Sequence, residues 1–248
     1  MDKYYLSSNI LFSILKEKGV EYLYHANTVL TSLTFIENQA LLSRAYVTNN
    51  GLVQTPQKSD KEDKAYKIWD DVFLDGLDLH KKYLRPNDYG PVLFVIKLDL
   101  LLSQSIPTVL ITKNNPWYWN LTDSLDDRYY SSIDDVNRDY LNGTTIDSRI
   151  MFTFRMPETA IKLNKYLEFI GIDRPPIIVE LKSRRQKNIG DFALEKITEA
   201  AKKNGLGHIP IVHRHISGIF DGCACYRNYT DLYETNFAEF KKRFKVDQ

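Results

Sequence analysis

Hydrophobic positions near the start of the chain follow helical spacing on both sides of one short aromatic strand. Over residues 8–18, apolar side chains recur every three or four positions, after a serine that can cap a helix and before Gly19, which can end one. Residues 21–26, which contain "YLYH", predict a strand. Helical spacing returns over residues 28–42 and stops at the turn sequence "TNNGL". The pattern therefore predicts a helix, a strand and a second helix.

The pattern changes after residue 50. Residues 53–71 are polar and predict a loop, whereas residues 69–80 have the inward apolar and outward acidic positions of a helix. From residue 89 onward, runs of β-branched and large apolar residues predict strands, and the first two, "GPVLFVIKLDLLL" and "TVLIT", are expected to be neighbours. Further strands are expected in "RIMFTFRM", "YLEFIGI" and "PPIIVELK", and helices at 190–204, at about 231–245 and, as a short piece, within the acidic stretch 123–142.

Several strands with few helices between them predict an α+β fold with a mixed or antiparallel sheet. The expected organisation is a main domain over residues 1–180, with a C-terminal extension of helix and strand over residues 181–248 packed on it. Neither common spacing of a glycine-rich phosphate loop occurs, which argues against P-loop NTPases and Rossmann dehydrogenases.

Composition narrows the class of protein. The 248 residues are 43% hydrophobic, enough for a substantial core, and no run approaches the roughly 18 apolar residues of a membrane span. The first residues lack the layout of a secretion signal, and the two cysteines are separated by one residue, which is poor geometry for a mutual disulfide. We therefore expect a cytoplasmic protein without a membrane partner. The net charge is +1, but residues 174–248 carry 14 Lys and Arg against 9 Asp and Glu.

One candidate site lies in "PPIIVELKSRR". Glu180 and Lys182 are two positions apart on a predicted strand, so their side chains share a face, and Asp173 precedes them as a second carboxylate. Such a set can hold a divalent metal and an attacking water, which is the layout of PD-(D/E)xK nucleases. The alternative is an ordinary solvated strand face.

A second candidate is the histidine and cysteine cluster near the C-terminus. His213, His215, Cys223 and Cys225 offer the mixed imidazole and thiolate ligands that zinc prefers, although their spacing is not standard. Zinc is thus a possible cofactor, and a zinc-stabilised, non-catalytic nucleic-acid-binding module is one alternative function. The competing interpretation is a packed hairpin with inert thiols.

A third candidate is the acidic sequence "WDDVFLDGLDLHKK". Closely spaced carboxylates can bind a hard cation, but the acidic outer face of a helix explains them without any chemistry and is the preferred interpretation. The residues concerned are Asp70, Asp71, Asp75, Asp78 and His80.

The run "LYHANTVLTSLTFIENQALLSR" carries a resemblance to a known family. It resembles the first strand and following helix of ADP-ribosyltransferases, especially the DarT-like toxins that modify nucleic acids, and more distantly the RNA 2′-phosphotransferases. In those families a strand ends in "YH", and a segment like "NGLLSR" follows the next helix. A later "PVLFV" strand and an "I…YL..I.ID" hairpin extend the resemblance over roughly residues 20–180.

The resemblance implies that the chain binds NAD, as a substrate, in a cleft between two small sheets. It implies that His25 contacts the adenosine ribose and that Ala26 and Asn27 add contacts. Arg44 and Gln54 complete the implied NAD site, with Arg44 or Arg155 facing the pyrophosphate.

The family's catalytic acid has no direct counterpart. A Glu on a late strand normally stabilises the oxocarbenium-like sugar that forms when the nicotinamide bond breaks. The matching strand begins "TTIDSRIMF", so Asp147 is the nearest carboxylate and Glu158 lies beyond the strand. The expected catalytic residues are therefore His25, Asp147 and Arg155.

Nucleic acid, RNA or DNA, is the first expected acceptor and protein the second. The loop "KNNPWYWN" offers Trp117 and Trp119 for stacking on bases and Lys113 for a phosphate. The competing interpretation places the tryptophans in the core. By the same resemblance, the chain is expected to act as a toxin or anti-phage effector, with an antitoxin protein as a possible partner.

Overall fold

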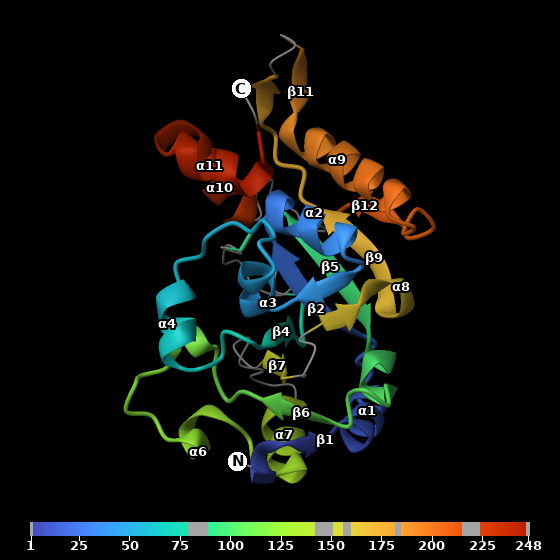
Figure 1. Ribbon diagram of the computed structural model, residues 1–248, viewed down its shortest axis with the longest axis vertical. Helices are drawn as coiled ribbons and strands as arrows, with labels where there is room; N and C mark the ends of the chain where they lie inside the picture. The colour runs from blue at the N-terminus through green and yellow to red at the C-terminus, as the bar shows by residue number, and fades with distance from the viewer. Residues whose placement is uncertain are drawn as a thin grey trace.

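A mixed eight-stranded sheet runs through the centre of the computed structural model (Figure 1). The strand order is β1-β6-β7-β4-β2-β5-β9-β12, and all neighbours pair antiparallel except β9 and β12. The predicted α+β fold with a mixed sheet is confirmed at this level. The structure describes residues 2–78, 89–141, 151–155, 160–181, 185–214 and 224–246.

The bounds of the elements are as follows. The central strands are β1 Leu6–Ser7, β2 Tyr22–Asn27, β4 Val72–Asp75, β5 Val92–Lys97, β6 Thr108–Ile111, β7 Met151–Phe154, β9 Leu167–Ile172 and β12 Ile211–His213. Two strand pairs stand apart, β3 Ala40–Leu42 with β8 Ala160–Lys162, and β10 Ile178–Glu180 with β11 Gln186–Asn188. The helices are α1 Ser8–Glu17, α2 Val29–Glu37, α3 Arg44–Asn49, α4 Asp60–Ala65, α6 Leu125–Arg128, α7 Ile133–Leu141, α8 Leu163–Tyr166, α9 Ile189–Lys203, α10 Ala224–Thr235 and α11 Phe237–Phe244, with short 3-10 helices η1 Asp2–Tyr4, η2 Leu98–Leu102 and η3 Pro116–Tyr118.

The second predicted helix ends earlier than its apolar spacing suggested. Helix α2 stops at Glu37, and Gln39 adopts a left-handed backbone with φ of +50°. The chain reverses there, and β3 pairs with β8. Leu41 and Leu42 are therefore buried as part of a strand rather than a helix. Their apolar character fits either structure, because helical spacing and strand spacing both place apolar residues inside.

The acidic stretch after residue 69 is a strand and not the predicted helix. In β4, Val72 and Leu74 are buried while Phe73 and Asp75 are partly exposed, the two-residue period of a strand. Strand β4 lies between β2 and β7. Strands β7, β4 and β2 all lie between β6 and β5, so the expectation that β5 and β6 are neighbours was wrong. The polar stretch before β4 was expected to be a loop, yet it contains α4.

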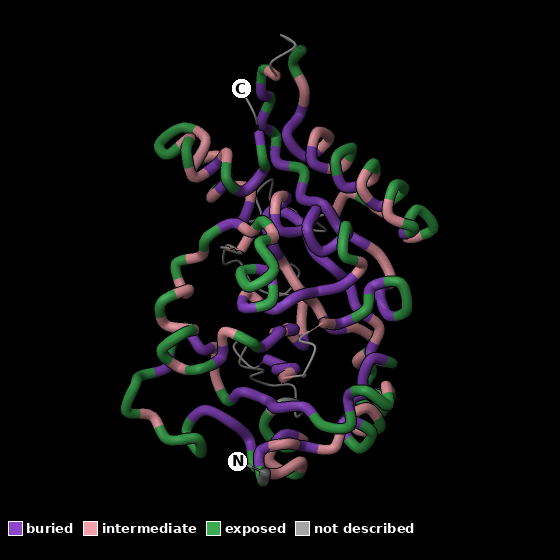
Figure 2. Tube along the Cα trace, in the orientation of Figure 1, coloured by how far each residue is buried: buried purple, intermediate pink, exposed green. Residues whose placement is uncertain are grey.

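The core lies on the central strands and the helices that cover them (Figure 2). Helix α9 packs against α2, and α11 contacts α2 as well. The predicted C-terminal helix is two helices, because Asn236 leaves helical geometry and caps α11 through its side chain. The rings of Tyr229 and Phe244 then meet at 5.1 Å between the two helices. The N- and C-termini lie at opposite ends of the long axis (Figure 1).

Among the described residues, no helix has the length and apolar character that crossing a membrane requires.

Candidate functional site

A cleft opens beside the C-terminal end of β2. Its lining comes from β2, β4, the segment around α4 and the loop that contains η3. About 860 Å³ of atom-free space lies within it, counting its open mouth. His25, Ala26, Asn27, Arg44 and Gln54, the five residues predicted to bind NAD, all line this cleft.

His25 is held in one tautomer by the neighbouring strand. Its Nδ1 lies 2.9 Å from the carbonyl oxygen of Phe73 in β4, and a carbonyl can only accept, so Nδ1 carries the proton. The neutral Nε2 then accepts from Nδ2 of Asn27 at 3.3 Å. Burial lowers the pKa of His25, and the ring packs against Phe35 at 5.7 Å. The imidazole is therefore a neutral, oriented group in the cleft wall.

The turn from β2 into α2 shapes the cleft floor. Oδ1 of Asn27 accepts from the backbone N–H of Thr28 at 2.9 Å, and the Thr28 hydroxyl caps α2. The hydroxyl of Thr28 also meets that of Thr55 at 2.7 Å. Gly90 passes close by, since a Cβ at this position would lie 2.5 Å from the backbone oxygen of Asn27. The floor is thus fixed from three separate segments.

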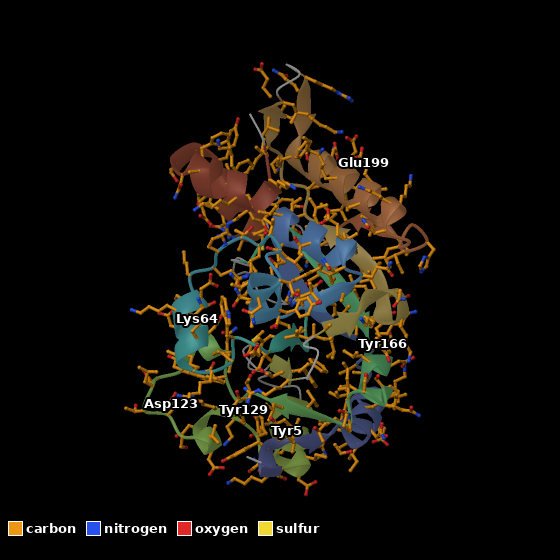
Figure 3. All side chains as sticks on the ribbon, viewed as in Figure 1. Tyr5, Lys64, Asp123, Tyr129, Tyr166 and Glu199 are labelled. Carbon is orange, nitrogen blue, oxygen red and sulfur yellow. The ribbon has the colours of Figure 1, made fainter. Side chains whose placement is uncertain are left out.

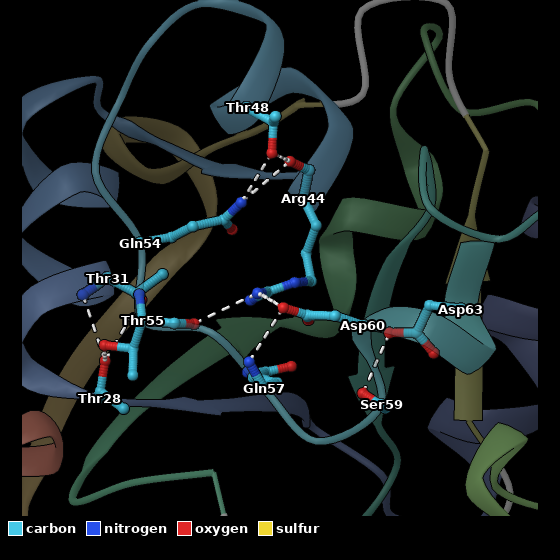
Figure 4. Close-up of polar contacts among 10 residues, drawn as sticks. All are labelled: Thr28, Thr31, Arg44, Thr48, Gln54, Thr55, Gln57, Ser59, Asp60 and Asp63. Carbon is cyan, nitrogen blue, oxygen red and sulfur yellow. Dashed lines mark hydrogen bonds and ion pairs between the residues drawn. The ribbon is translucent and has the colours of Figure 1, made fainter. Parts of the chain in front are cut away.

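Arg44 projects along the cleft wall from the start of α3 (Figure 4). Its Nη2 donates to the backbone oxygen of Thr55 at 3.2 Å and pairs with the Asp60 carboxylate at 2.7 Å. Asp60 in turn accepts from the backbone N–H of Gln57 at 3.1 Å. The guanidinium carbon also lies 5.2 Å from the centre of the Trp69 ring. Arg44 is therefore a fixed cation whose charge Asp60 balances.

Gln54 lines the cleft and is hydrogen-bonded to residues of α3. Its Nε2 donates to the backbone oxygen of Arg44 and to the hydroxyl of Thr48, both at 3.1 Å. These bonds tie the 53–59 segment to α3. Gln54 thus has a structural task in addition to its place in the cleft lining.

Three carboxylates line the cleft in the described part of the chain. Burial raises the pKa of Asp63 to about 6, and the Ser59 hydroxyl opposes this by donating to it at 3.1 Å. Asp71 forms an ion pair with Arg155, and Asp75 ends β4 beside Tyr24. No pattern in the sequence indicates that Asp63 belongs to the site, because it lies in a charged stretch typical of a solvated surface.

The structure gives Arg155 a different place from the predicted one. Its Nε and Nη2 donate to the two oxygens of Asp71 at 2.8 and 2.7 Å, and it is not among the cleft-lining residues. The bonds from Asp71 raise the pKa of Arg155 further. Arg155 supports the cleft through Asp71 rather than facing a pyrophosphate. Asp147 and Glu158 lie outside the described residues.

Only one of the three residues predicted to bind nucleic acid reaches the cleft mouth. Trp117 lines it and is 53% exposed. Trp119 is buried, and its ring packs against Tyr129 at 5.3 Å, so it cannot stack on a base as expected. Lys113 is exposed, and its Nζ donates to the backbone oxygen of Asp126 at 2.7 Å, away from the cleft lining.

The predicted nuclease set does not come together among the described residues. Asp173 is fully buried, pairs with Arg214 at 3.2 Å and accepts from the Tyr229 hydroxyl at 3.0 Å. Glu180 is exposed on β10, and Lys182 lies outside the described residues. Asp173 therefore serves an internal ion pair.

The zinc candidates are only partly described. Nε2 of His213 lies 2.9 Å from Asp191, and Cys225 is buried in α10. His215 and Cys223 lie outside the described residues. Within the described ranges, no group of three or more His, Cys, Asp or Glu is arranged to hold a metal ion.

The third candidate, the acidic stretch, is dispersed by β4. Asp71 and Asp75 reach the cleft, whereas Asp78 pairs with Arg214 at 2.5 Å. Asp70 is exposed, and His80 lies outside the described residues.

A scan against models of known protein families and a search of curated proteins find no match to this chain.

Proposed function

We propose that the protein is an NAD-dependent ADP-ribosyltransferase that modifies nucleic acid. The observation that carries this proposal is the convergence of His25, Ala26, Asn27, Arg44 and Gln54 on one cleft. The five residues span thirty positions and three kinds of local structure. The family resemblance implies NAD contacts for these residues, and their meeting in one cleft supports that implication.

In this proposal His25 orients the adenosine ribose of NAD. The proton on Nδ1 is committed to the Phe73 carbonyl, which leaves Nε2 as an acceptor. A ribose hydroxyl can donate to Nε2 in place of the Asn27 amide. The Asn27 amide is then available to the next oxygen of the sugar.

Arg44 provides the positive charge for the pyrophosphate. A guanidinium matches two oxygens of a phosphate through parallel N–H donors. Asp60 now occupies that face of Arg44 at 2.7 Å. Binding of NAD therefore requires Arg44 to exchange a carboxylate for a phosphate, with Asp60 and α4 moving away.

Asp75 is the acid that we assign to the developing sugar cation. It lines the cleft at the end of β4, two positions after Phe73, whose carbonyl orients His25. Asp71 is buried in its ion pair with Arg155 and burial raises the pKa of Asp63 to about 6, whereas Asp75 is partly exposed in the cleft. A carboxylate close to the oxocarbenium-like carbon lowers the barrier to losing nicotinamide. Asp147 remains the acid predicted from the sequence.

Nucleic acid is the acceptor class that the resemblance implies. Trp117 is the described residue that can stack on a base at the cleft mouth. A protein acceptor is the second candidate, and the observation that favours it is the acidic character of the loop following Trp117, with Asp123, Asp126 and Asp127.

The test is transfer of label from NAD to single-stranded RNA, single-stranded DNA or protein, together with release of nicotinamide. His25→Ala is expected to weaken NAD binding by at least about tenfold in calorimetry, and Asp75→Asn to keep binding but slow nicotinamide release by about a hundredfold. His208→Ala is the matched control, because His208 is exposed and outside the cleft. If wild-type protein neither binds NAD nor releases nicotinamide, the proposal is wrong. Label on protein alone would move the acceptor to the second candidate.

A further inference from the structure

Arg128, the last residue of α6, places its guanidinium in the interior of the protein. The residue is 9% exposed, and its guanidinium carbon lies 4.9 Å from the centre of the Tyr66 ring and 5.1 Å from that of the Trp119 ring. The chain turns inward here, since Asp123 lies at the outer edge of the molecule whereas Tyr129 lies farther in (Figure 3). Aromatic faces attract a cation, but a buried arginine normally has an anionic partner as well, because it has lost its hydration.

The carboxylates that precede Arg128 in the chain do not supply that partner. Asp126 pairs with Lys3 at 2.8 Å, and Asp127 accepts from the Ser124 hydroxyl at 2.7 Å in the capping box of α6. No carboxylate in the described part of the chain forms an ion pair with Arg128. The guanidinium charge is therefore compensated by the aromatic rings alone.

Two buried N–H groups of this cluster lack an acceptor. Nη2 of Arg128 donates to the backbone oxygen of Asn120 at 2.8 Å, but Nε of Arg128 and Nε1 of Trp119 find no hydrogen-bond partner among the described residues. Both nitrogens can only donate, so the partner that they lack is an acceptor. An unpaired buried donor costs free energy, and native proteins rarely leave one.

The two donors lie in one small, aromatic volume. Nε is bonded to the guanidinium carbon, which lies 5.1 Å from the centre of the ring that carries Nε1. The Trp119 ring packs against Tyr66 at 5.7 Å and against Tyr129 at 5.3 Å. The Tyr66 hydroxyl is itself engaged, because it donates to the backbone oxygen of Trp119. An anion suits these surroundings better than a water does, since it accepts from both donors and also balances the buried charge.

We infer that Arg128 and Trp119 form a binding site for one small monovalent anion, of which chloride is the simplest example. Arg128 supplies the charge and one N–H, and Trp119 supplies the second N–H. Their exposures of 9% and 6% argue against a phosphate that belongs to a nucleic-acid chain, so this site is separate from the exposed Trp117. It lies behind the cleft wall, because Ile68 packs in the same cluster as Trp119 and also lines the cleft. The inference does not depend on NAD chemistry.

The test is chloride binding by the whole protein. Chlorine-35 NMR line broadening detects bound chloride directly, and thermal unfolding follows its effect when chloride replaces gluconate at constant ionic strength. Arg128→Met removes the guanidinium, and Trp119→Phe keeps an aromatic ring but removes the N–H. Arg138→Met is the matched control, because Arg138 is an exposed arginine that pairs with Asp135 and Asp139. Circular dichroism checks that the variants fold, and Trp119→Phe decides the question if Arg128→Met does not.

We expect chloride to broaden the NMR line saturably and to raise the Tm of the wild type by at least about 2 °C, because an anion that binds only the folded state stabilises it. The Kd for chloride should rise by at least about tenfold in Trp119→Phe. The saturable effect should be lost in Arg128→Met and kept in Arg138→Met.

Three results would overturn the inference. One is a wild type without saturable broadening, which would assign the two donors to water. Another is an Arg128→Met or Trp119→Phe variant that binds chloride as tightly as the wild type does. The third is a chloride effect that Arg138→Met abolishes, which would place the anion at the surface.

Discussion

Arg155 and Asp71, 84 positions apart in the chain, form a two-bond ion pair that joins the residue after β7 to the residue before β4. The Asp71 side chain is completely buried, while that of Arg155 is 25% exposed. This difference in exposure decides which substitution costs less stability. Water can hydrate an unpaired Arg155 guanidinium, whereas it cannot reach an unpaired Asp71 carboxylate. The pair also fixes one wall of the cleft.

Removing Arg155 is therefore expected to cost more than removing Asp71. Arg155→Met leaves Asp71 buried without this cation and should lower the free energy of unfolding by about 3–5 kcal/mol. Asp71→Asn should cost less, and the double variant should lose much less stability than the sum of the two single losses. Urea unfolding of the four proteins measures this. Equal losses in both single variants would show that burial of Asp71 does not set the cost.

Gly90 is expected to be essential for the floor of the cleft. Its φ is +147°, and an added Cβ would lie 2.5 Å from the Asn27 oxygen and 2.6 Å from the Thr28 nitrogen. Gly90→Ala should therefore lower the free energy of unfolding by about 2 kcal/mol or more and weaken NAD binding, since Asn27 must move.

Gly51→Ala is the control for Gly90, because Gly51 also has a positive φ, +64°, but open space around it. It should show the strain of about 1–2 kcal/mol alone, with NAD binding unchanged. Thermal unfolding and calorimetry separate the two effects. A Gly90 variant that binds NAD like wild type would mean that the floor tolerates displacement.

Asp63 should make stability depend on pH. Its pKa is raised in the folded protein to about 6, above the ordinary value of 3.8, so the folded state holds this proton more tightly than the unfolded state. The contribution of Asp63 to stability therefore falls as pH rises from about 4 to 6, and its ionisation is a cost at neutral pH. Asp63→Asn should be more stable than wild type at pH 7, by at most about 3 kcal/mol, and equal to it at pH 4. Stability that rises for Asp63→Asn at pH 4 as well would exclude this cause.

The same carboxyl should tune anion binding in the cleft. Below about pH 6 Asp63 is neutral, so the affinity for NAD should be higher there and should fall as Asp63 ionises. The Asn variant should lack that part of the pH profile. Titration calorimetry between pH 5 and 8, with nicotinamide mononucleotide as a ligand of lower charge, measures it. A wild-type affinity that does not change across pH 6 would remove Asp63 from the site.

Arg214 should be a second cation that is costly to remove. It lies between Asp78 at 2.5 Å and Asp173 at 3.2 Å, with all three side chains nearly buried. Gly171 provides its room, since a Cβ there would lie 2.6 Å from Cγ of Arg214. Arg214→Leu should lower the free energy of unfolding by about 3–5 kcal/mol. Adding Asp78→Asn should restore part of the loss, and urea unfolding at neutral pH would detect a failure to do so.

The sequence predicted correctly those elements whose apolar spacing fits only a helix or only a strand. Helix α9 and strand β9 fall where the pattern placed them, because their length and flanking residues exclude the alternative. Helix α2 and strand β4 were misjudged at short apolar runs, where helix and strand both bury the same residues. Neighbouring strands in the sheet are set by long-range pairing, which local patterns do not encode.

In the candidate site too, residues of one local motif were predicted, whereas residues brought there by tertiary packing were not. His25, Ala26 and Asn27 are consecutive, so one motif predicts all three, and they line the cleft together. The Phe73 carbonyl that orients His25 is a backbone group of a strand taken for a helix, and no side-chain pattern could predict it. Asp63 was not predicted, because its raised pKa arises from packing around α4 and not from a local sequence pattern.

Strand β12 has a consequence for how the chain can be divided. It covers the open side of β9 through the pairs Ile211 with Ile170 and His213 with Ile172, although it lies beyond residue 180, where the sequence suggested a boundary. A chain shortened to its first 180 residues would present β9 as an unprotected edge, ready to add a strand from another copy. Precipitation of such a fragment would therefore report lost strand pairing rather than an inability of the remaining residues to form their core.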